Sequence, residues 1–181
     1  MITAIRCNFG HPRLIPLSVN GVAGLCRKVA DALHHAHQCG VIHRDVKPSN
    51  IMIDASGEPH IMDFGLAKRE SSDVTMAVDG NAFGTPAYMS PEQARVDAHN
   101  ADCRSDVTSL GVILFQSHSG EPPFRGRPLV ILPHVANDDP PPVRSLNRMV
   151  PLLLDTICWK SMEKLPQRRY PTADALSDEL G

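Results

Sequence analysis

The chain has 181 residues, of which 42% are hydrophobic and 21% are charged, so it can bury one hydrophobic core without the help of a disulfide or a metal. Its net charge of -2 and its pI near 6.5 exclude an overall basic field for nucleic acid or an anionic membrane, although they do not exclude local patches. One domain is therefore the simplest expectation.

The first fifteen residues show no clear hydrophobic period. Gly10, Pro12 and Pro16 argue against a regular element in this segment. Residues 1–15 are therefore left unassigned, and the domain is expected to begin at residue 16.

A long helix is predicted next. Ser18 is a good N-cap residue, and Gly40 suits the left-handed position that ends many helices. Between them, apolar side chains recur at helical spacing, at Val22, Cys26, Val29, Leu33 and Ala36. The helix is expected to bury this one face.

Shorter elements follow along the chain. Residues 51–53 and 60–62 are apolar runs on either side of an Asp-Ala-Ser-Gly turn, which predicts a small hairpin. The stretch 65–92 is rich in Ser, Thr, Gly and Asp and reads as a long surface loop. The segments 104–119, 150–163 and 172–180 have helical patterns, so the fold is expected to be mainly α.

Two polar motifs flank the predicted hairpin. Residues 43–50 read HRDVKPSN, and residues 63–65 read DFG, thirteen positions after Asn50. Residues 84–92 (GTPAYMSPE) and 104–107 (RSDV) follow in order. Together these motifs closely resemble the catalytic and metal-binding loops of protein kinases. Their residues are most similar to those of the bacterial Hanks-type serine/threonine branch.

The resemblance implies a fold and its boundaries. Residues 16–181 are expected to form the C-terminal, large lobe of the protein-kinase-like fold, an α+β class that is mainly α. The catalytic loop is placed at 43–50 and the activation segment at 63–92. The N-terminal, small lobe is expected to be missing.

The resemblance also implies a reaction, the transfer of the ATP γ-phosphate to a serine or threonine hydroxyl of a protein substrate. Asp45 is expected to accept a hydrogen bond from that hydroxyl, and Lys47 to place its ammonium near the transferred phosphate. Oxygen ligands suit Mg²⁺, a hard cation, so Asn50 and Asp63 are expected to hold the magnesium ions that bridge the phosphates. The implied cofactors are ATP and Mg²⁺.

Further residues are assigned structural or regulatory roles. The guanidinium of Arg44 is a ready partner for a phosphorylated residue of the loop, and Thr85 is expected to help position the catalytic residues. Glu92 and Arg169 match an ion pair buried across the lobe, and Asp106 is expected to hold the backbone of the catalytic loop. The candidate phosphorylation sites are Ser71, Ser72 and Thr75, and the residues that complete the two motifs are His43, Phe64 and Gly65.

A complete kinase also has a small lobe with a glycine-rich loop, a strand lysine and a helix glutamate. No G-x-G-x-x-G precedes His43, and Lys28 lies inside the predicted long helix. We therefore expect the isolated chain to bind ATP weakly and to transfer phosphate slowly, since little else would orient the phosphates. A small lobe supplied by another chain or by upstream sequence is the expected partner.

The large lobe departs from the family pattern in places. Gln116, Ser117 and His118 replace a run that usually contains leucines, and Thr108 stands where an aromatic residue is common. If the polar residues face the core, their burial is unfavourable. Pro133 falls in a segment that the family makes helical, which predicts a kink or a broken turn. These departures, and an end at Gly181, favour a shortened or decaying gene product.

The cluster His34, His35 and His37 raises the alternative of a metal site, since His34 and His37 are one helical turn apart. No carboxylate or cysteine joins them at suitable spacing, so a helix surface is favoured. Five scattered cysteines without a C-x-x-C pair favour reduced thiols. With no membrane-length apolar run and no secretory signal, a cytoplasmic chain is expected, without nucleic-acid or membrane partners.

Three other functions compete with the kinase lobe. A pseudokinase-like scaffold would use the helical surface to hold a partner, but it would not need the retained aspartates. A non-functional fragment would expose the face that a small lobe covers and would aggregate. A small-molecule phosphotransferase shares an aspartate followed by an asparagine, but Lys47 and residues 90–92 speak against it.

Overall fold

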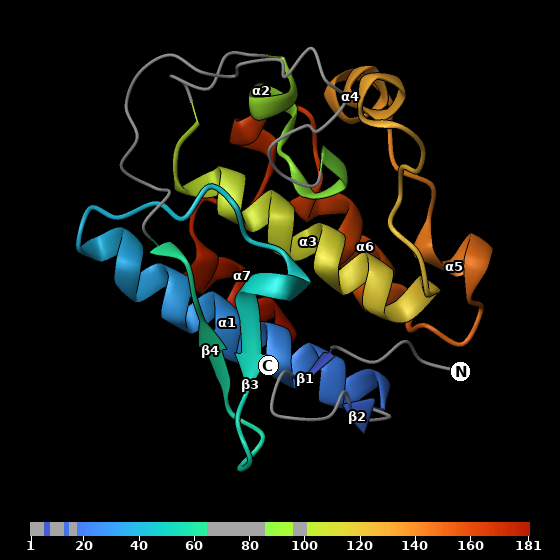
Figure 1. The fold of residues 1–181 in the computed structure, drawn as a ribbon. Coiled ribbons are helices and arrows are strands. Elements are labelled where there is room, and N and C mark those ends of the chain that lie inside the picture. The colour runs from blue at the N-terminus through green and yellow to red at the C-terminus, as the bar shows by residue number, and fades with distance from the viewer. Residues whose placement is uncertain (1–5, 8–12, 15–17, 65–85, 96–100) are drawn as a thin grey trace.

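The computed structural model describes residues 6–7, 13–14, 18–64, 86–95 and 101–181. Most of this structure is helical (Figure 1), with a few short strands and 3-10 turns. The helices are α1 (Val19–Gln38), α2 (Pro91–Ala94), α3 (Cys103–Ser119), α4 (Pro128–Asn137), α5 (Val143–Leu146), α6 (Leu152–Ser161) and α7 (Ala173–Leu180). The strands are β1 (Arg6–Cys7), β2 (Arg13–Leu14), β3 (Ile51–Ile53) and β4 (Pro59–Ile61), and the 3-10 turns are η1 (Pro48–Asn50), η3 (Pro86–Tyr88) and η5 (Pro166–Arg168).

The long helix α1 has the predicted ends. The Ser18 hydroxyl accepts a hydrogen bond from the backbone N–H of Gly21 at 3.1 Å, which satisfies one of the free donors of the first turn. At the other end Gly40 has a φ of 76°, the left-handed conformation expected of it. The predicted helix is confirmed at both of its ends.

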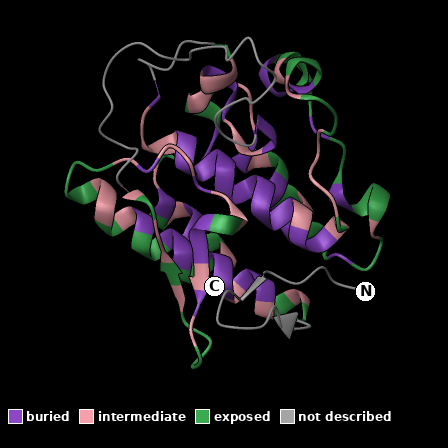
Figure 2. Ribbon diagram, in the orientation of Figure 1, coloured by how far each residue is buried: buried purple, intermediate pink, exposed green. Residues whose placement is uncertain are grey.

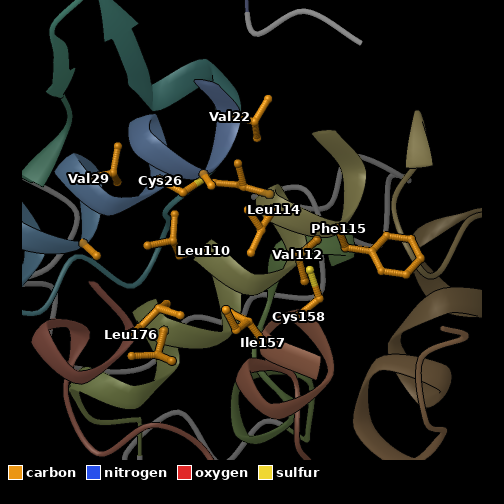
Figure 3. Close-up of a cluster of buried hydrophobic side chains, with 14 of the residues drawn as sticks. Val22, Cys26, Val29, Leu110, Val112, Leu114, Phe115, Ile157, Cys158 and Leu176 are labelled. Atoms are coloured by element: carbon orange, nitrogen blue, oxygen red, sulfur yellow. The ribbon is translucent and has the colours of Figure 1, made fainter. Parts of the chain in front are cut away.

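Helix α3 is the centre of the core. Nearly every residue from Ser105 to His118 is buried (Figure 2), and α1, α6 and α7 all pack against this helix. A helix that is buried all round needs apolar or small residues on every side. Figure 3 shows its side chains meeting those of α1, α6 and α7; the labelled residues are Val22, Cys26, Val29, Leu110, Val112, Leu114, Phe115, Ile157, Cys158 and Leu176.

The hairpin and the predicted helices at 104–119, 150–163 and 172–180 are present, each within about two residues of its expected bounds. In the hairpin, β3 and β4 pair antiparallel with Ile51 opposite Ile61. The small sheet lies beside α1, which β4 contacts. The expected mainly α, α+β architecture is therefore confirmed.

Two expectations were wrong. Within residues 1–15, β1 and β2 form an antiparallel pair in which Arg6 lies opposite Leu14. Strands of two residues are too short for a hydrophobic period to reveal, and Gly10 falls between them in sequence. The broken turn expected at Pro133 is also absent, since helix α4 runs through this residue. One lost backbone donor leaves the later bonds intact, such as that from Asp138 N–H to the His134 carbonyl at 2.9 Å.

The unusual polar residues of α3 do face the interior. Ser117 and His118 are both buried. His118 Nδ1 donates to the Leu114 carbonyl at 2.7 Å, while its Nε2 has no hydrogen-bond partner among the described residues. Thr108 is also buried and donates to the Arg104 carbonyl at 3.3 Å. The helix itself therefore offsets part of the cost of polar burial.

In the described part of the chain, no helix combines the length and the apolar character needed to cross a membrane.

Candidate active site

The predicted catalytic loop, residues 43–50, is held by a side chain from the first turn of α3. Asp106 is fully buried, and its carboxylate accepts the backbone N–H of His43 at 2.9 Å and that of Arg44 at 2.8 Å. Arg44 has a φ of 64°, a conformation that is unfavourable for a side chain with a Cβ. The two hydrogen bonds to Asp106 hold this strained turn, which sets the direction of the residues that follow it.

His43 joins the catalytic loop to the DFG motif. Its Nδ1 accepts the backbone N–H of Asp45 at 3.3 Å, so its Nε2 carries the proton and donates to the Met62 carbonyl at 2.8 Å. The ring also meets Phe64 edge to face, with a centroid separation of 4.8 Å. One buried imidazole therefore links the loop at 43–50 to the residues around Asp63.

Three polar side chains converge at the start of the hairpin. Lys47 Nζ lies 2.7 Å from Asp45 Oδ2, and Asn50 Nδ2 donates to the Asp45 carbonyl at 2.9 Å and to Asp45 Oδ2 at 3.3 Å. Asp45 keeps 25% of its side chain exposed, so its carboxylate can be reached from solvent. The carboxylate is thus oriented by an ammonium and an amide, with one face open.

The hairpin brings Asn50 close to Asp63 in space. The Met62 N–H donates to the Asn50 carbonyl at 2.8 Å, directly beyond the paired residues Ile51 and Ile61. Asp63 itself is exposed and has a φ of 62°. Asn50 and Asp63, which are thirteen positions apart in sequence, therefore lie at the same open end of the two strands.

The oxygen set at this end fits Mg²⁺. The amide nitrogen of Asn50 donates to Asp45, which fixes the orientation of the side chain. Its Oδ1 accepts the Ser49 hydroxyl at 3.4 Å and keeps a second lone pair that could bind the ion. Asp63 adds an exposed carboxylate. Hard oxygen atoms from one amide and one carboxylate suit a cation that keeps several waters and binds phosphates.

The expected ion pair between Glu92 and Arg169 is present and bidentate. Arg169 Nη1 and Nη2 lie 2.8 and 2.7 Å from the two carboxylate oxygens of Glu92, and Ser105 donates to the same carboxylate at 2.8 Å. Both side chains are almost fully buried. Burial alone would raise the pKa of Glu92, but the hydrogen bonds and the charge of Arg169 outweigh it and hold the pKa below the usual 4.5.

His37 has a role that the sequence reasoning missed. Its Nε2 lies 2.7 Å from Asp106 Oδ2, and its side chain is only 8% exposed, so the expectation that this cluster is a helix surface was wrong for His37. The signal was available, because His37 follows Leu33 by four positions and so continues the buried face of α1. His35 is exposed, as expected, and His34 is half-buried. No cluster of three metal-ligating residues occurs within the described ranges.

Another link was not predicted either. Gln93 Nε2 donates to the Arg44 carbonyl at 2.7 Å and so ties α2 to the catalytic loop. The same Gln93 completes a capping box with Ser90 at the start of α2. Such a link follows from tertiary packing across 49 positions and leaves no local pattern in the sequence.

Some predicted site residues lie outside the described residues. They are Gly65, Ser71, Ser72, Thr75 and Thr85. Of the activation segment 63–92, the structure describes residues 63–64 and 86–92.

Comparison with known proteins identifies the family of this arrangement. The protein kinase domain model matches residues 12–173. The serine/threonine-protein kinase PknB of Mycobacterium leprae (strain TN) is 40% identical over 160 residues, which cover 88% of this chain and 25% of that protein. PknB of Mycobacterium tuberculosis (strain ATCC 25618 / H37Rv) is 39% identical over 165 residues, 90% of this chain and 25% of that protein.

A third relative agrees with these two. The probable serine/threonine-protein kinase PknB of Bifidobacterium longum (strain NCC 2705) is 40% identical over 155 residues, 84% of this chain and 22% of that protein. The chain thus spans about a quarter of the length of these curated relatives. The resemblance to bacterial Hanks-type serine/threonine kinases is confirmed, and the chain belongs to the protein kinase family.

Proposed function

We propose that this chain acts as the large lobe of a bacterial serine/threonine protein kinase and transfers the γ-phosphate of ATP to a serine or threonine hydroxyl of a protein. The observation that carries the proposal is the orientation of Asp45 between Lys47 and Asn50, on a loop whose backbone Asp106 holds. Family membership supports the same reaction.

The chemistry follows from positions and charges. The transition state of phosphoryl transfer is loose and highly charged, so positioning and neutralisation supply most of the rate. The open face of Asp45 accepts a hydrogen bond from the substrate hydroxyl, orients its oxygen and receives its proton. Lys47, now paired with Asp45 at 2.7 Å, offers its ammonium to the oxygens of the transferred phosphate.

Asn50 and Asp63 would hold Mg²⁺ in this scheme. When bound, the ion supplies neutralisation of charge on the phosphate oxygens. The amide of Asn50 would then have two roles, since its nitrogen orients Asp45 and its oxygen would bind the ion.

We also propose that another polypeptide region completes the ATP site. The sequence before His43 has no glycine-rich loop and no candidate for the strand lysine. The orientation of the α and β phosphates would then come from a small lobe on another chain or in preceding sequence. Without it, we expect weak ATP binding and slow transfer.

A cytoplasmic location is part of the proposal. The four cysteines within the described residues, Cys26, Cys39, Cys103 and Cys158, are free thiols. Burial raises the pKa of the Cys26 thiol to about 12, so this side chain is a neutral, unreactive part of the core. Free thiols of this kind suit a reducing compartment.

The test is Mg²⁺-dependent ATP binding and autophosphorylation by the purified chain, beside an Asp63→Asn variant and an Asp178→Asn control on the exposed side of α7. The proposal predicts weak binding that needs Mg²⁺, is lost in Asp63→Asn and is unchanged in the control. ATP binding that survives Asp63→Asn at full strength would contradict the site. Binding without any transfer, even with a small lobe added, would instead favour a scaffold.

A further inference from the structure

The connection between α5 and α6 lies away from the β3–β4 hairpin (Figure 1), and it carries exposed apolar side chains. We call this apolar surface the α5–α6 patch. Its members are large hydrophobic side chains that remain open to solvent, namely Leu146, Met149, Leu152, Leu153 and Trp159. Met149 is 84% exposed, the largest exposed fraction among these residues. Single exposed apolar residues are ordinary, but a contiguous group marks an interaction surface.

The patch is contiguous because of helical geometry. Successive residues of a helix are about 100° apart, so Leu152 and Trp159 lie on the same side of α6, with Leu153 next to them. The opposite side of α6 is buried and carries Leu154 and Ile157. Helix α5, which carries Leu146, packs against α6.

The turn that carries Met149 is held in place by hydrogen bonds. Asn147 Nδ2 donates to the His118 carbonyl at 2.8 Å, which anchors the connection to the end of α3. Asn147 Oδ1 also accepts the backbone N–H of Met149 at 3.1 Å. Met149 is therefore presented to solvent by a hydrogen-bonded turn.

The segment that carries the patch is positively charged. Arg144 and Arg148 are exposed on either side of Leu146, and Lys160 lies over the Tyr170 ring at 4.1 Å. Between residues 143 and 160 the acidic residue is Asp155, which is half-buried and accepts the backbone N–H of Arg144 at 3.3 Å. Three basic residues and one acidic residue give this segment a net charge of +2, whereas the whole chain carries -2.

We propose that the α5–α6 patch docks onto an anionic lipid surface. Exposed apolar side chains can enter the boundary between headgroups and acyl chains, where leucine and tryptophan are favourable, while flanking arginines meet lipid phosphates. Helix α6, Leu152–Ser161, is far shorter than the ~20 residues of a membrane span, so it would lie in the interface. This association would hold the kinase lobe at a membrane without any change in its chemistry.

The chain carries a built-in probe for the test, because Trp159 is its single tryptophan and lies in the patch. Vesicles of phosphatidylcholine alone, and of phosphatidylcholine with phosphatidylglycerol, are titrated into the full chain while tryptophan emission is recorded. The proposal predicts a blue shift and co-sedimentation with the anionic vesicles, both weakened by added salt.

Matched variants locate the contact. Arg144→Gln with Arg148→Gln removes two surface cations, each worth about 1 kcal/mol at an anionic surface, so affinity should fall roughly 30-fold. Leu152→Gln with Leu153→Gln should abolish the blue shift, while the variant should still unfold cooperatively, as the unchanged chain does. Leu129→Gln with Val130→Gln, two exposed apolar residues of α4, should leave binding unchanged.

Absence of any shift or co-sedimentation with anionic vesicles would overturn the proposal, as would equal binding by the patch variants. A blue shift with an acidic apolar peptide but with no vesicle would also overturn it and assign the patch to a protein partner. None of these readouts involves ATP. A failure of lipid binding would therefore not affect the proposed phosphotransfer, and a failure of phosphotransfer would not affect the proposed lipid binding.

Discussion

At the scale of single residues, buried charge does most of the positioning. Asp106 places one carboxylate under two backbone N–H groups and the imidazole of His37. Glu92 and Arg169 place another buried charge pair between α2 and the segment before α7. A buried charge without its partner is unfavourable, so removing one member of either pair should measurably lower the free energy of unfolding.

Arg169→Ala should lower the free energy of unfolding by ~3–5 kcal/mol, because it leaves Glu92 charged and unpaired in the interior. Denaturant unfolding measures this, with Arg168→Ala as the control, since Arg168 is its exposed neighbour. A loss below ~1 kcal/mol would mean that water reaches the carboxylate and that the pair is not a buried one.

The same pair predicts a sensitivity to acid. Since the pKa of Glu92 is lowered in the fold, its contribution to stability is present above the usual 4.5 and disappears as the pH falls through the folded-state pKa. Unfolding free energies measured from neutral pH downwards should fall more steeply below pH 4.5 for the native chain than for Glu92→Gln. Parallel curves for the two proteins would count against this assignment.

At the scale of elements, the close crossing of α3 and α6 depends on one glycine. A Cβ on Gly111 would lie 2.5 Å from the Cβ of Ser161, whereas a Cβ on Gly24 of α1 would meet nothing within 4 Å. Gly111→Ala should therefore cost ~1–3 kcal/mol through overpacking. Gly24→Ala should stabilise the chain by ~0.5–1 kcal/mol. Thermal unfolding of both variants checks the pair, and a neutral Gly111→Ala would show that the helices can move apart.

The elements also show what a sequence can and cannot predict here. Helix α1 was predictable because its cap, its apolar face and its final glycine agree. The hairpin was predictable because two short apolar runs flank a turn. The β1–β2 pair and the continuity of α4 through Pro133 were not, since both depend on backbone hydrogen bonds and not on side-chain pattern.

At the scale of the whole molecule, the site was predictable to the extent that ordered motifs could be matched. Asp45, Lys47 and Asn50 were assigned from the motif at 43–50, and they do converge. The contact of His37 with Asp106 joins residues 69 positions apart. The spacing of His37 after Leu33 indicates that His37 is buried, but its partner Asp106 follows only from the packing of α1 on α3.

Reconstitution tests most directly whether Asp45 directs phosphate transfer on this lobe. The chain is mixed with a separately produced kinase small lobe, Mg²⁺ and ATP, and phosphate incorporation into a protein substrate is followed for the native chain and for Asp45→Asn. We expect transfer that requires the small lobe, appears on serine or threonine, and falls about 10²- to 10⁴-fold in Asp45→Asn. Two results would contradict this role of Asp45. One is equal transfer by Asp45→Asn, and the other is no transfer by the native chain when both lobes bind ATP together.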